Sequence, residues 1–270
     1  MQANRVRRAV ASRIALLILA TGPAVAQDDL PATPSVGLHG IVGLSAGVRP
    51  EYDGARDNKT VLMPTINLFY GDSLFFTRMT AGANLLRYKT EQGLSITAGP
   101  LLGLRRGRDQ DDHDALRGLG NIDRALDAGA FVRLRKQGWQ ASAEVRQNVT
   151  NTDQGATVNV SVGHGMPVGP KLRLRTAFDT TWASSGYMRT FYGIDAEQSA
   201  QSGLAQHEVG SGFKHVGASL TADYAINREW TGVAALRYKR LLGGAADSPI
   251  VSSLGDRDQV STSIGIQYRF

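Results

Sequence analysis

Apolar and polar residues alternate with a period of two along most of this chain. The segment 258–270 shows the pattern most clearly, with Val260, Thr262, Ile264, Ile266, Tyr268 and Phe270 on one face and Gln259, Ser261, Ser263, Gly265, Gln267 and Arg269 on the other. Successive side chains of a strand point to opposite faces of a sheet, so this period predicts strands. The same alternation covers approximately 36–48, 61–70, 73–88, 93–105, 127–136, 138–149, 157–166, 170–183, 214–226, 229–241 and 258–270. The expected fold class is all-β.

Two architectures satisfy this alternation, and they differ in where the apolar face points. A soluble sandwich or lipocalin-like barrel buries that face, whereas a membrane barrel turns it toward lipid and keeps a polar lumen. Many of the segments are longer than the about five or six residues of an ordinary strand. Their length suits a tilted crossing of a bilayer, which takes about 9 to 11 residues.

Three features favour the membrane barrel. The polar faces carry mostly Gly, Ser, Thr and Gln, which suits a crowded lumen. Tyr224, Trp230, Tyr268 and Phe270 lie at strand ends, as expected of an aromatic girdle at one membrane interface. The chain stops on Phe270 within an alternating strand, which is natural when the last strand pairs with the first and leaves no free edge. We therefore predict an antiparallel transmembrane β-barrel in which Leu220 faces lipid and Ser219 faces the lumen.

The number of strands should be even in a bacterial single-chain barrel, so the eleven segments miss one. Twelve strands result if Tyr187–Gly193 is a strand, and ten result if two of the weaker N-terminal segments merge. The long connections 106–126, 195–213 and 242–257 are expected to face outward. With twelve strands this fails for 106–126. Either the count between residues 61 and 126 is off by one, or that loop is periplasmic.

The first 26 residues have a different character. Four arginines accompany the apolar run Ile14–Ala20, and Ala24-Val25-Ala26 supplies the small residues that a signal peptidase reads. We predict a cleaved signal peptide over 1–26 and a barrel over 27–270. Cleavage removes those four arginines and lowers the formal net charge from +6 to +2. The basicity of the whole chain therefore argues little for nucleic-acid binding.

The residues that enzymes and metal sites need are scarce. There is no cysteine, which excludes disulfides, thiolate metal sites and a cysteine nucleophile. The run Asp109–Asp114 holds five potential hard-cation ligands in six residues but lacks the spacing and turn glycine of a calcium loop, so a solvated acidic loop is expected. The histidines His39, His113, His164, His207 and His215 are dispersed, and no spacing marks one as catalytic. We predict no catalytic, cofactor-binding or metal-binding residues and no enzyme activity.

Alternation also assigns a charge to the lumen. Arg133, Arg135, Arg146, Arg173, Arg175, Arg237, Lys239 and Arg269 point inward, against Glu144, Asp179 and Asp223. Salt bridges that fill a narrow lumen are the simpler interpretation. If a conducting path remains, it should prefer anions.

Six short motifs occur in order along the mature chain. They are Pro50-Glu-Tyr-Asp-Gly54, Leu116-Arg-Gly-Leu-Gly-Asn-Ile122, Trp182-Ala183 followed by Tyr187-Met-Arg-Thr-Phe-Tyr-Gly193, Ala200-Gln-Ser-Gly-Leu204, Ser248-Pro-Ile250 and the closing Tyr268-Arg-Phe270. With these motifs the chain resembles the MipA/OmpV family, with Tyr192-Gly193 standing where Phe-Gly is expected. The resemblance implies an outer-membrane protein of Gram-negative bacteria. In the MipA branch it implies a scaffold joining a murein transglycosylase to a penicillin-binding protein, and it carries over no catalytic residues.

Three functions follow as expectations. The first is a non-enzymatic barrel whose periplasmic turns or rim bind these two cell-wall enzymes, in contact with outer-membrane lipid and without nucleic acid. The second is a small, anion-preferring outer-membrane channel. The third is an outer-membrane hydrolase or acyltransferase that would use His164, His207 or His215.

Overall fold

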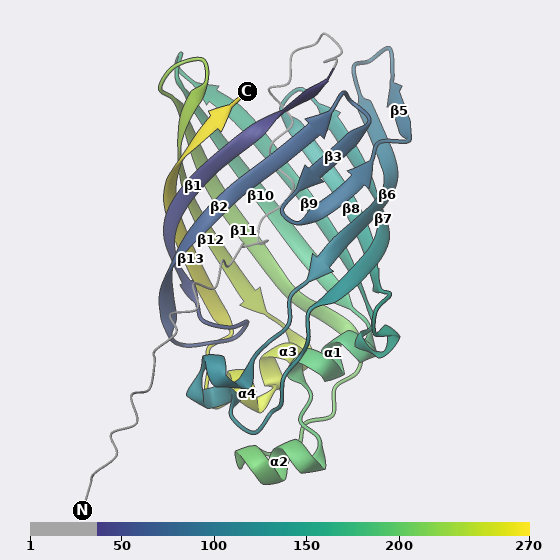
Figure 1. Ribbon diagram of the computed structural model, residues 1–270, viewed down its shortest axis with the longest axis vertical. Coiled ribbons are helices and arrows are strands. Elements are labelled where there is room, and N and C mark those ends of the chain that lie inside the picture. The colour runs from purple at the N-terminus through teal and green to yellow at the C-terminus, as the bar shows by residue number, and fades with distance from the viewer. Residues whose placement is uncertain (1–36) are drawn as a thin grey trace, which may run out of the picture.

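The computed structural model describes residues 37–270, which form a β-barrel with short helices at one end (Figure 1). The predicted signal peptide over 1–26 lies outside the described residues. The strands are β1 (Leu38–Pro50), β2 (Asn58–Tyr70), β3 (Leu74–Thr77), β4 (Thr80–Ala83), β5 (Leu86–Lys89), β6 (Ser95–Arg105), β7 (Ala125–Lys136), β8 (Trp139–Asn148), β9 (Ala156–Val168), β10 (Leu172–Ala183), β11 (Gly212–Ala225), β12 (Trp230–Leu241) and β13 (Asp258–Arg269). The α-helices are α1 (Ser185–Tyr192), α2 (Ala196–Ser202), α3 (Gly243–Asp247) and α4 (Pro249–Ser252), and single 3-10 turns are η1 (Gln110–Asp112), η2 (Asp114–Leu116) and η3 (Thr152–Gln154).

The strands form one antiparallel sheet that closes on itself. β13 pairs with β1 from Val48↔Thr262 to Ile41↔Arg269, which confirms that the last strand pairs with the first. Gly40 and Phe270 add two backbone hydrogen bonds of 3.1 Å to this seam. At the other junction, β4 and β5 both pair with β6 and share one position in the wall. The barrel therefore has twelve strand positions, as expected.

The twelfth strand does not come from Tyr187–Gly193, and that prediction is wrong. These residues belong to α1, which begins after Ser184, whose hydroxyl accepts a hydrogen bond from the Tyr187 backbone N–H. A serine at this position satisfies a free N–H group of the first helical turn. Met188 and Tyr192, one turn apart, then bury their side chains on the same helix face. The N-terminal cap and this buried face together favour the helix over a strand.

The missing strand lies within the segment 73–88, which is a hairpin and not one strand. β3 and β4 are joined by the two-residue turn Arg78-Met79, and both turn residues have positive φ, at 49° and 62°. Such a turn suits the twist of paired strands but normally uses Gly or Asn. The count between residues 61 and 126 was therefore off by one. As a result, 106–124 lies at the same end as the other long connections (Figure 1).

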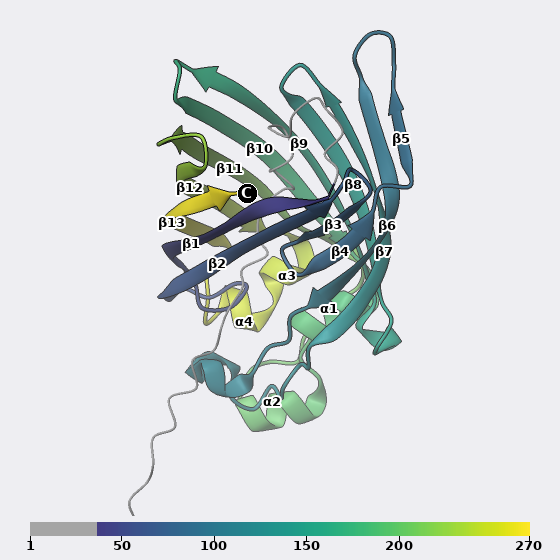
Figure 2. The same cartoon turned by 45° about the horizontal axis from the view of Figure 1, so that its top comes forward.

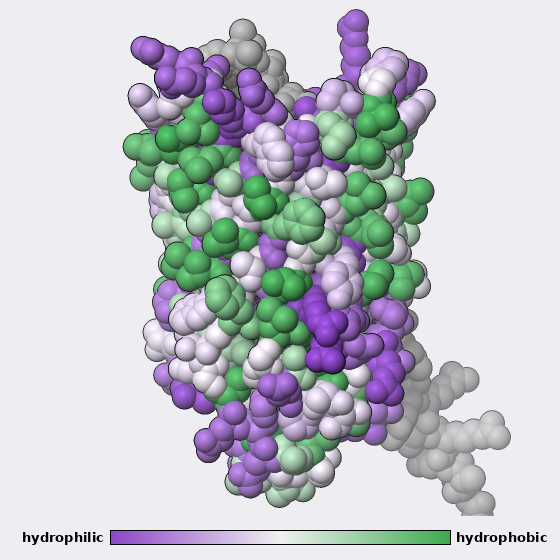
Figure 3. Space-filling model, turned by 180° about the vertical axis from the view of Figure 1, so that it is seen from behind, coloured by the Kyte–Doolittle hydropathy of each residue, from purple (hydrophilic) through white to green (hydrophobic). Residues whose placement is uncertain are grey.

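The facing predicted from alternation is confirmed. Leu62, Leu220 and Ile264 expose 64%, 42% and 69% of their surface on the outside of the wall. Figure 3 shows hydrophobic side chains gathered over the middle of the barrel and hydrophilic ones toward its ends. This is the distribution of a barrel that crosses a bilayer. Among residues 37–270, no helix is long and apolar enough to cross a membrane.

The two ends of the barrel differ. The turn end carries the short connections 71–73, 90–94, 137–138, 169–171 and 226–229 together with Phe270 (Figure 1). Trp230 and Tyr268 meet there with ring centroids 5.0 Å apart, which agrees with the expected girdle. The opposite end carries the helices and long connections. Since long loops of such barrels face outward and short turns face the periplasm, the turn end is the periplasmic end.

Candidate functional site

The long connections pack together into a folded structure, which we call the loop cap and define as residues 51–57, 106–124, 149–155, 184–211 and 242–257 (Figure 2). Its helices lie across the end of the barrel, below the ends of the strands in Figure 1. Long loops of a barrel are free to vary, so an ordered cap requires buried contacts of its own.

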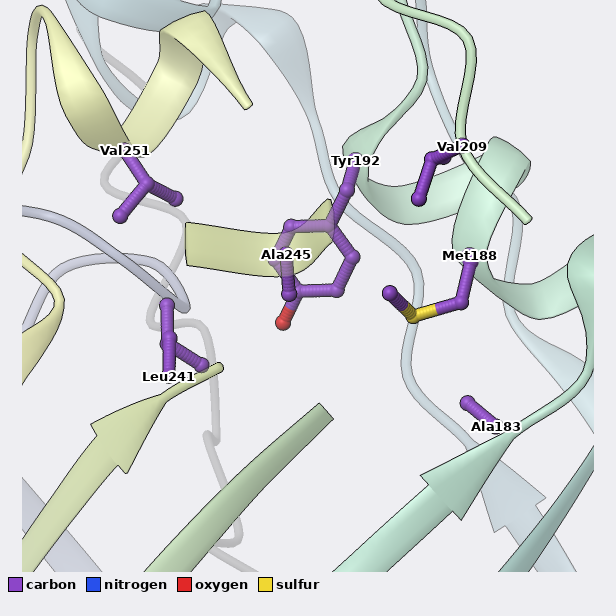
Figure 4. Packing of buried hydrophobic residues seen from close by; sticks show 7 residues of the cluster. All are labelled: Ala183, Met188, Tyr192, Val209, Leu241, Ala245 and Val251. Carbon is purple, nitrogen blue, oxygen red and sulfur yellow. The ribbon is translucent and has the colours of Figure 1, made fainter. Parts of the chain in front are cut away.

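One buried cluster joins the cap to the wall. Met188 and Tyr192 of α1 pack with Val209 of the following loop, Ala245 of α3 and Val251 of α4. Ala183 and Leu241, at the cap ends of β10 and β12, complete the cluster (Figure 4). Burial of apolar side chains stabilises by about 25 cal/mol per Å². The connections 184–211 and 242–257 are thereby held over the barrel end as one unit.

A second buried cluster joins four of the cap connections to each other. Leu116 and Leu119 of the 106–124 connection pack against Ile194 and Ile250, and Tyr52 and Leu204 lie against them. The amide of Gln198 in α2 donates a 2.7 Å hydrogen bond to the Leu119 carbonyl. Every one of these residues except Ile194 and Gln198 lies in a motif on which the family resemblance rests. These motifs are therefore brought together by the cap.

A charged centre lies beneath α1. Asp53 accepts hydrogen bonds from the Tyr192 hydroxyl at 2.6 Å and from Lys214 Nζ at 3.2 Å, and it also forms an ion pair with Lys239. Burial acts to raise the pKa of Asp53, but the charges of Lys214 and Lys239 and the hydrogen bonds from Lys239 and Tyr192 outweigh it. They hold the pKa well below its ordinary value. Asp53 thus ties the first loop to strands β11 and β12.

Burial and the neighbouring Asp53 charge both raise the pKa of Tyr192 well above its ordinary value. The phenol therefore stays protonated and remains a donor to Asp53. The carbonyl of Tyr192 accepts a 2.6 Å hydrogen bond from the Ser248 hydroxyl. Tyr192 consequently bonds to both the first and the last long connection.

The acidic run Asp109–Asp114 forms the two 3-10 turns η1 and η2. His113 Nε2 lies 3.4 Å from a carboxylate oxygen of Asp57 and 3.8 Å from one of Glu51, and its ring packs edge-on against Tyr52. The described residues contain no group of three His, Asp or Glu side chains arranged to hold a metal ion. Through His113, the run connects the loop 106–124 to the loop 51–57.

The lumen is cationic, and its carboxylates are paired as the simpler interpretation expected. Arg175 donates two hydrogen bonds to Asp223, at 2.5 and 2.8 Å. Asp179 accepts from Arg237 at 2.9 Å and lies 3.0 Å from His215 Nε2. Glu144 accepts a single hydrogen bond from Arg146 Nε, two residues along the same strand. The bidentate pair Arg175–Asp223 joins the neighbouring strands β10 and β11, and the single bond from Arg237 to Asp179 joins β12 to β10.

An apolar cluster inside the barrel was missed by the sequence reasoning. Phe69, Phe75, Leu101 and Phe131 are buried together, and the Arg133 guanidinium lies 4.2 Å from the Phe131 ring centroid and 4.7 Å from that of Phe75. A cation over aromatic faces is attracted by the ring quadrupole. The sequence contained evidence for this cluster, because Phe69 and Phe131 fall on the otherwise polar, lumen-facing sides of their strands.

The five histidines do not converge. His39 stacks on Phe69 and His164 lies against Trp139, both in the wall, whereas His113 belongs to the cap. His207 Nε2 lies 2.9 Å from the Gly244 carbonyl, and His215 pairs with Asp179. The three histidines considered for catalysis, His164, His207 and His215, therefore have separate partners in separate places.

Comparison with known proteins decides the family. The family model described as MltA-interacting protein MipA matches residues 42–270, which is nearly all of the described chain. The chain belongs to the MipA family. It is 26% identical over 240 residues to the MltA-interacting protein of Escherichia coli (strain K12), covering 86% of this chain and 91% of that protein.

Another relative of this MipA-family chain is YiaT of Escherichia coli (strain K12), named as a putative outer membrane protein. The two are 28% identical over 220 residues, covering 81% of this chain and 85% of YiaT. Among solved structures, the NanC porin matches with 8% identity and a TM-score of 0.46, over 85% of this chain and all of the other. OprB of Pseudomonas putida matches with 12% identity and a TM-score of 0.41, over 76% and 49%. The chain is thus an outer-membrane barrel protein of the MipA family.

Proposed function

We propose that this protein is a non-enzymatic outer-membrane scaffold that holds a murein transglycosylase, and with it a penicillin-binding protein, at its periplasmic face. The observation that carries the proposal is its membership of the MipA family together with its relation to a protein named for interacting with MltA. Both proposed partners are proteins, so the proposal requires a protein-binding surface on the periplasmic side.

The turn end offers such a surface. All four residues of β5 are exposed, and β5 pairs on one side only, with β6. The β5–β6 hairpin stands beyond the neighbouring turns (Figures 1 and 2). Beside it is a hollow of about 320 Å³ whose lining includes Asp72, Arg87, Tyr88 and Arg135. An exposed strand edge next to a hollow suits a partner that adds an extended segment to the sheet.

Two matched charge reversals test this surface. Arg87→Glu changes the hairpin, where Arg87 forms a 3.4 Å ion pair with Asp72 and its side chain is 51% exposed. Arg117→Glu changes the cap at the other end, where the Arg117 side chain is 73% exposed and pairs with Asp114. The measurement is capture of a purified murein transglycosylase by each detergent-solubilised variant. We expect Arg87→Glu to reduce capture at least fivefold and Arg117→Glu to leave it unchanged. Equal capture by both variants, or a loss confined to Arg117→Glu, would contradict the proposed face.

The alternative function is a small channel, and the cationic lumen is the observation that favours it. Arg133, Arg175 and Arg237 all line the interior, and a conducting path beside them should prefer anions. Against a wide channel stand the two buried clusters of the cap at the outer end. Single-channel recording in a planar bilayer with a salt gradient tests this function. A steady anion-selective conductance would support it, and a cation-selective one would contradict the charge argument.

A further inference from the structure

The barrel wall is interrupted on one side, near the cap. β3 pairs with only Asn67–Tyr70 of β2, and β4 pairs with β6 no further than Gly103. The rest of β2, residues 58–66, pairs with β1 and has no strand on its other side. The hairpin turn Arg78-Met79 ends the shared wall, with the Met79 carbonyl accepting a 3.1 Å hydrogen bond from Leu104. We call the region between 58–66 of β2 and the cap end of β6 the wall gap.

The sequence of β2 agrees with a free edge. Pro64 lies within 58–66, and proline is restricted to strand edges because it has no N–H to donate. In hydrocarbon, each unpaired backbone group costs several kcal/mol, so an uncovered edge of this length is unfavourable and favours a ligand seated at the gap. The gap is open only toward the cap, which places it in the outer half of the membrane.

Cationic side chains surround the cap end of the gap. Arg49 of β1 and Lys59 of β2 are paired neighbours on one side. On the other side, Arg106 and Arg124 follow and precede the paired residues Arg105 and Ala125, and the next bridge joins Arg108 to Ile122. Arg106 and Arg124 therefore lie opposite each other on a two-stranded arm.

These cations have no acidic partner within ion-pair distance among residues 37–270. The Arg49 Nε is buried without a hydrogen-bond partner. Burial and the charges of Arg49 and Arg124 lower the pKa of Arg106 to about 10. Asp112 acts on Arg49 from a greater distance. Like charges gathered in this way repel, and an anion among them would relieve the repulsion.

The flanks of the gap below this cluster are apolar. Leu62 and Ile66 on β2 expose 64% and 40% of their surface, and Leu104 on β6 exposes 50%. A ligand that fits both the cationic cluster and the apolar flanks has an anionic head group and apolar chains. We propose that the wall gap binds a phosphorylated lipid of the outer leaflet, with its phosphate among Arg49, Arg106 and Arg124 and its acyl chains against Leu62 and Leu104.

The test begins with the mature chain refolded in detergent, which contains no bacterial lipid. Native mass spectrometry measures binding of bisphosphorylated lipid A, of the same lipid A without its phosphates, and of inorganic phosphate. We expect bisphosphorylated lipid A to bind at least tenfold more tightly than the phosphate-free form and inorganic phosphate not to bind at millimolar concentration. Arg106→Gln and Arg49→Gln should each weaken lipid A binding about tenfold, because each removes a charge-assisted hydrogen bond.

Arg117→Gln is the matched control, since Arg117 is an exposed cap arginine paired with Asp114, and lipid A binding should not change. Without lipid, Arg106→Gln should unfold at the same or a higher temperature than the parent, because a repelled charge is gone; this shows that the variant folds. Three outcomes would overturn the proposal: equal binding of the phosphate-free lipid, inorganic phosphate binding as tightly as lipid A, or undiminished binding by both gap variants. A Leu62→Cys variant that crosslinks two chains in membranes would likewise overturn it, because the β2 edge would then be covered by a second copy.

Discussion

Tyr192 donates its hydroxyl hydrogen to a carboxylate oxygen of Asp53 at 2.6 Å across 139 residues of sequence. The bond joins the first long connection to α1, and Asp53 in turn pairs with Lys214 and Lys239 of the wall. A small number of polar contacts therefore fastens the cap to the barrel in addition to its apolar clusters.

Removing the Asp53 charge should loosen the cap. Asp53→Asn leaves Lys214 and Lys239 beside each other without their carboxylate. Breaking a buried pair costs roughly 3–5 kcal/mol, and because the Asp53 side chain is 34% exposed we expect about 1–2 kcal/mol. The measurement is the rate of limited proteolysis in 184–211, which should rise severalfold. Glu208→Gln, an exposed change in the same connection, serves as the control, and an equal rate for both variants would count against the role of Asp53.

The cap should resist acid down to the ordinary pKa of an aspartate and lose stability below it. The folded-state pKa of Asp53 is depressed, so its stabilisation is fully present above about 3.8 and is lost as the pH falls through the folded value. Protease resistance of 184–211 should stay constant from pH 8 to about 4 and decline below that range. In Asp53→Asn this acid-dependent decline should be smaller. A decline centred between pH 5 and 7 would assign the effect to a different group.

The lipid-facing and lumen-facing positions of β11 should respond oppositely to charge. Leu220→Arg places a guanidinium against hydrocarbon, which costs about 2–4 kcal/mol near the midplane, whereas Ser219→Arg points into the polar lumen. We expect Leu220→Arg to reduce the heat-modifiable folded form in membranes and Ser219→Arg to preserve it. Equal amounts of folded protein from both variants would contradict the facing.

Two glycines of one motif offer a matched pair. Gly118 and Gly120 both have positive φ, at 79° and 72°, but a Cβ on Gly118 would lie 2.7 Å from the backbone of Gln201 and Ser202, while one on Gly120 would meet nothing within 4 Å. Both alanine variants carry the conformational strain, and only Gly118→Ala also pushes 106–124 away from α2. Gly118→Ala should therefore unfold the cap at a lower temperature than Gly120→Ala does. Circular dichroism in detergent measures the difference, and coincident transitions would show that the close approach is unimportant.

The wall could be predicted from the sequence because the bilayer dictates its pattern. Lipid on one side and a polar lumen on the other impose a period of two, so the predicted segment 229–241 matches β12 (Trp230–Leu241) within one residue. The same alternation placed Glu144, Asp179 and Asp223 in the lumen, and each has a cationic partner there.

Where the bilayer imposes no pattern, prediction was weaker. Met188 and Tyr192 of α1 are buried by loops far away in the sequence, so no local alternation reveals them. The turn Arg78-Met79 lacks the glycine or asparagine that usually marks a hairpin, and the apolar pattern of 73–88 runs through it unbroken. The cap as a whole depends on contacts such as Leu116 with Ile250, which only the folded chain brings together.

The seam between β1 and β13 sets the order in which the protein can be completed. Its hydrogen bonds join the first strand of the barrel to a strand more than 200 residues later in the chain, ending in the bonds between Gly40 and Phe270. Until β13 is in place, one edge of β1 has no partner, and an unpaired strand edge is prone to aggregate. Shortening β13 would consequently leave an open, curved sheet with two unpaired strand edges.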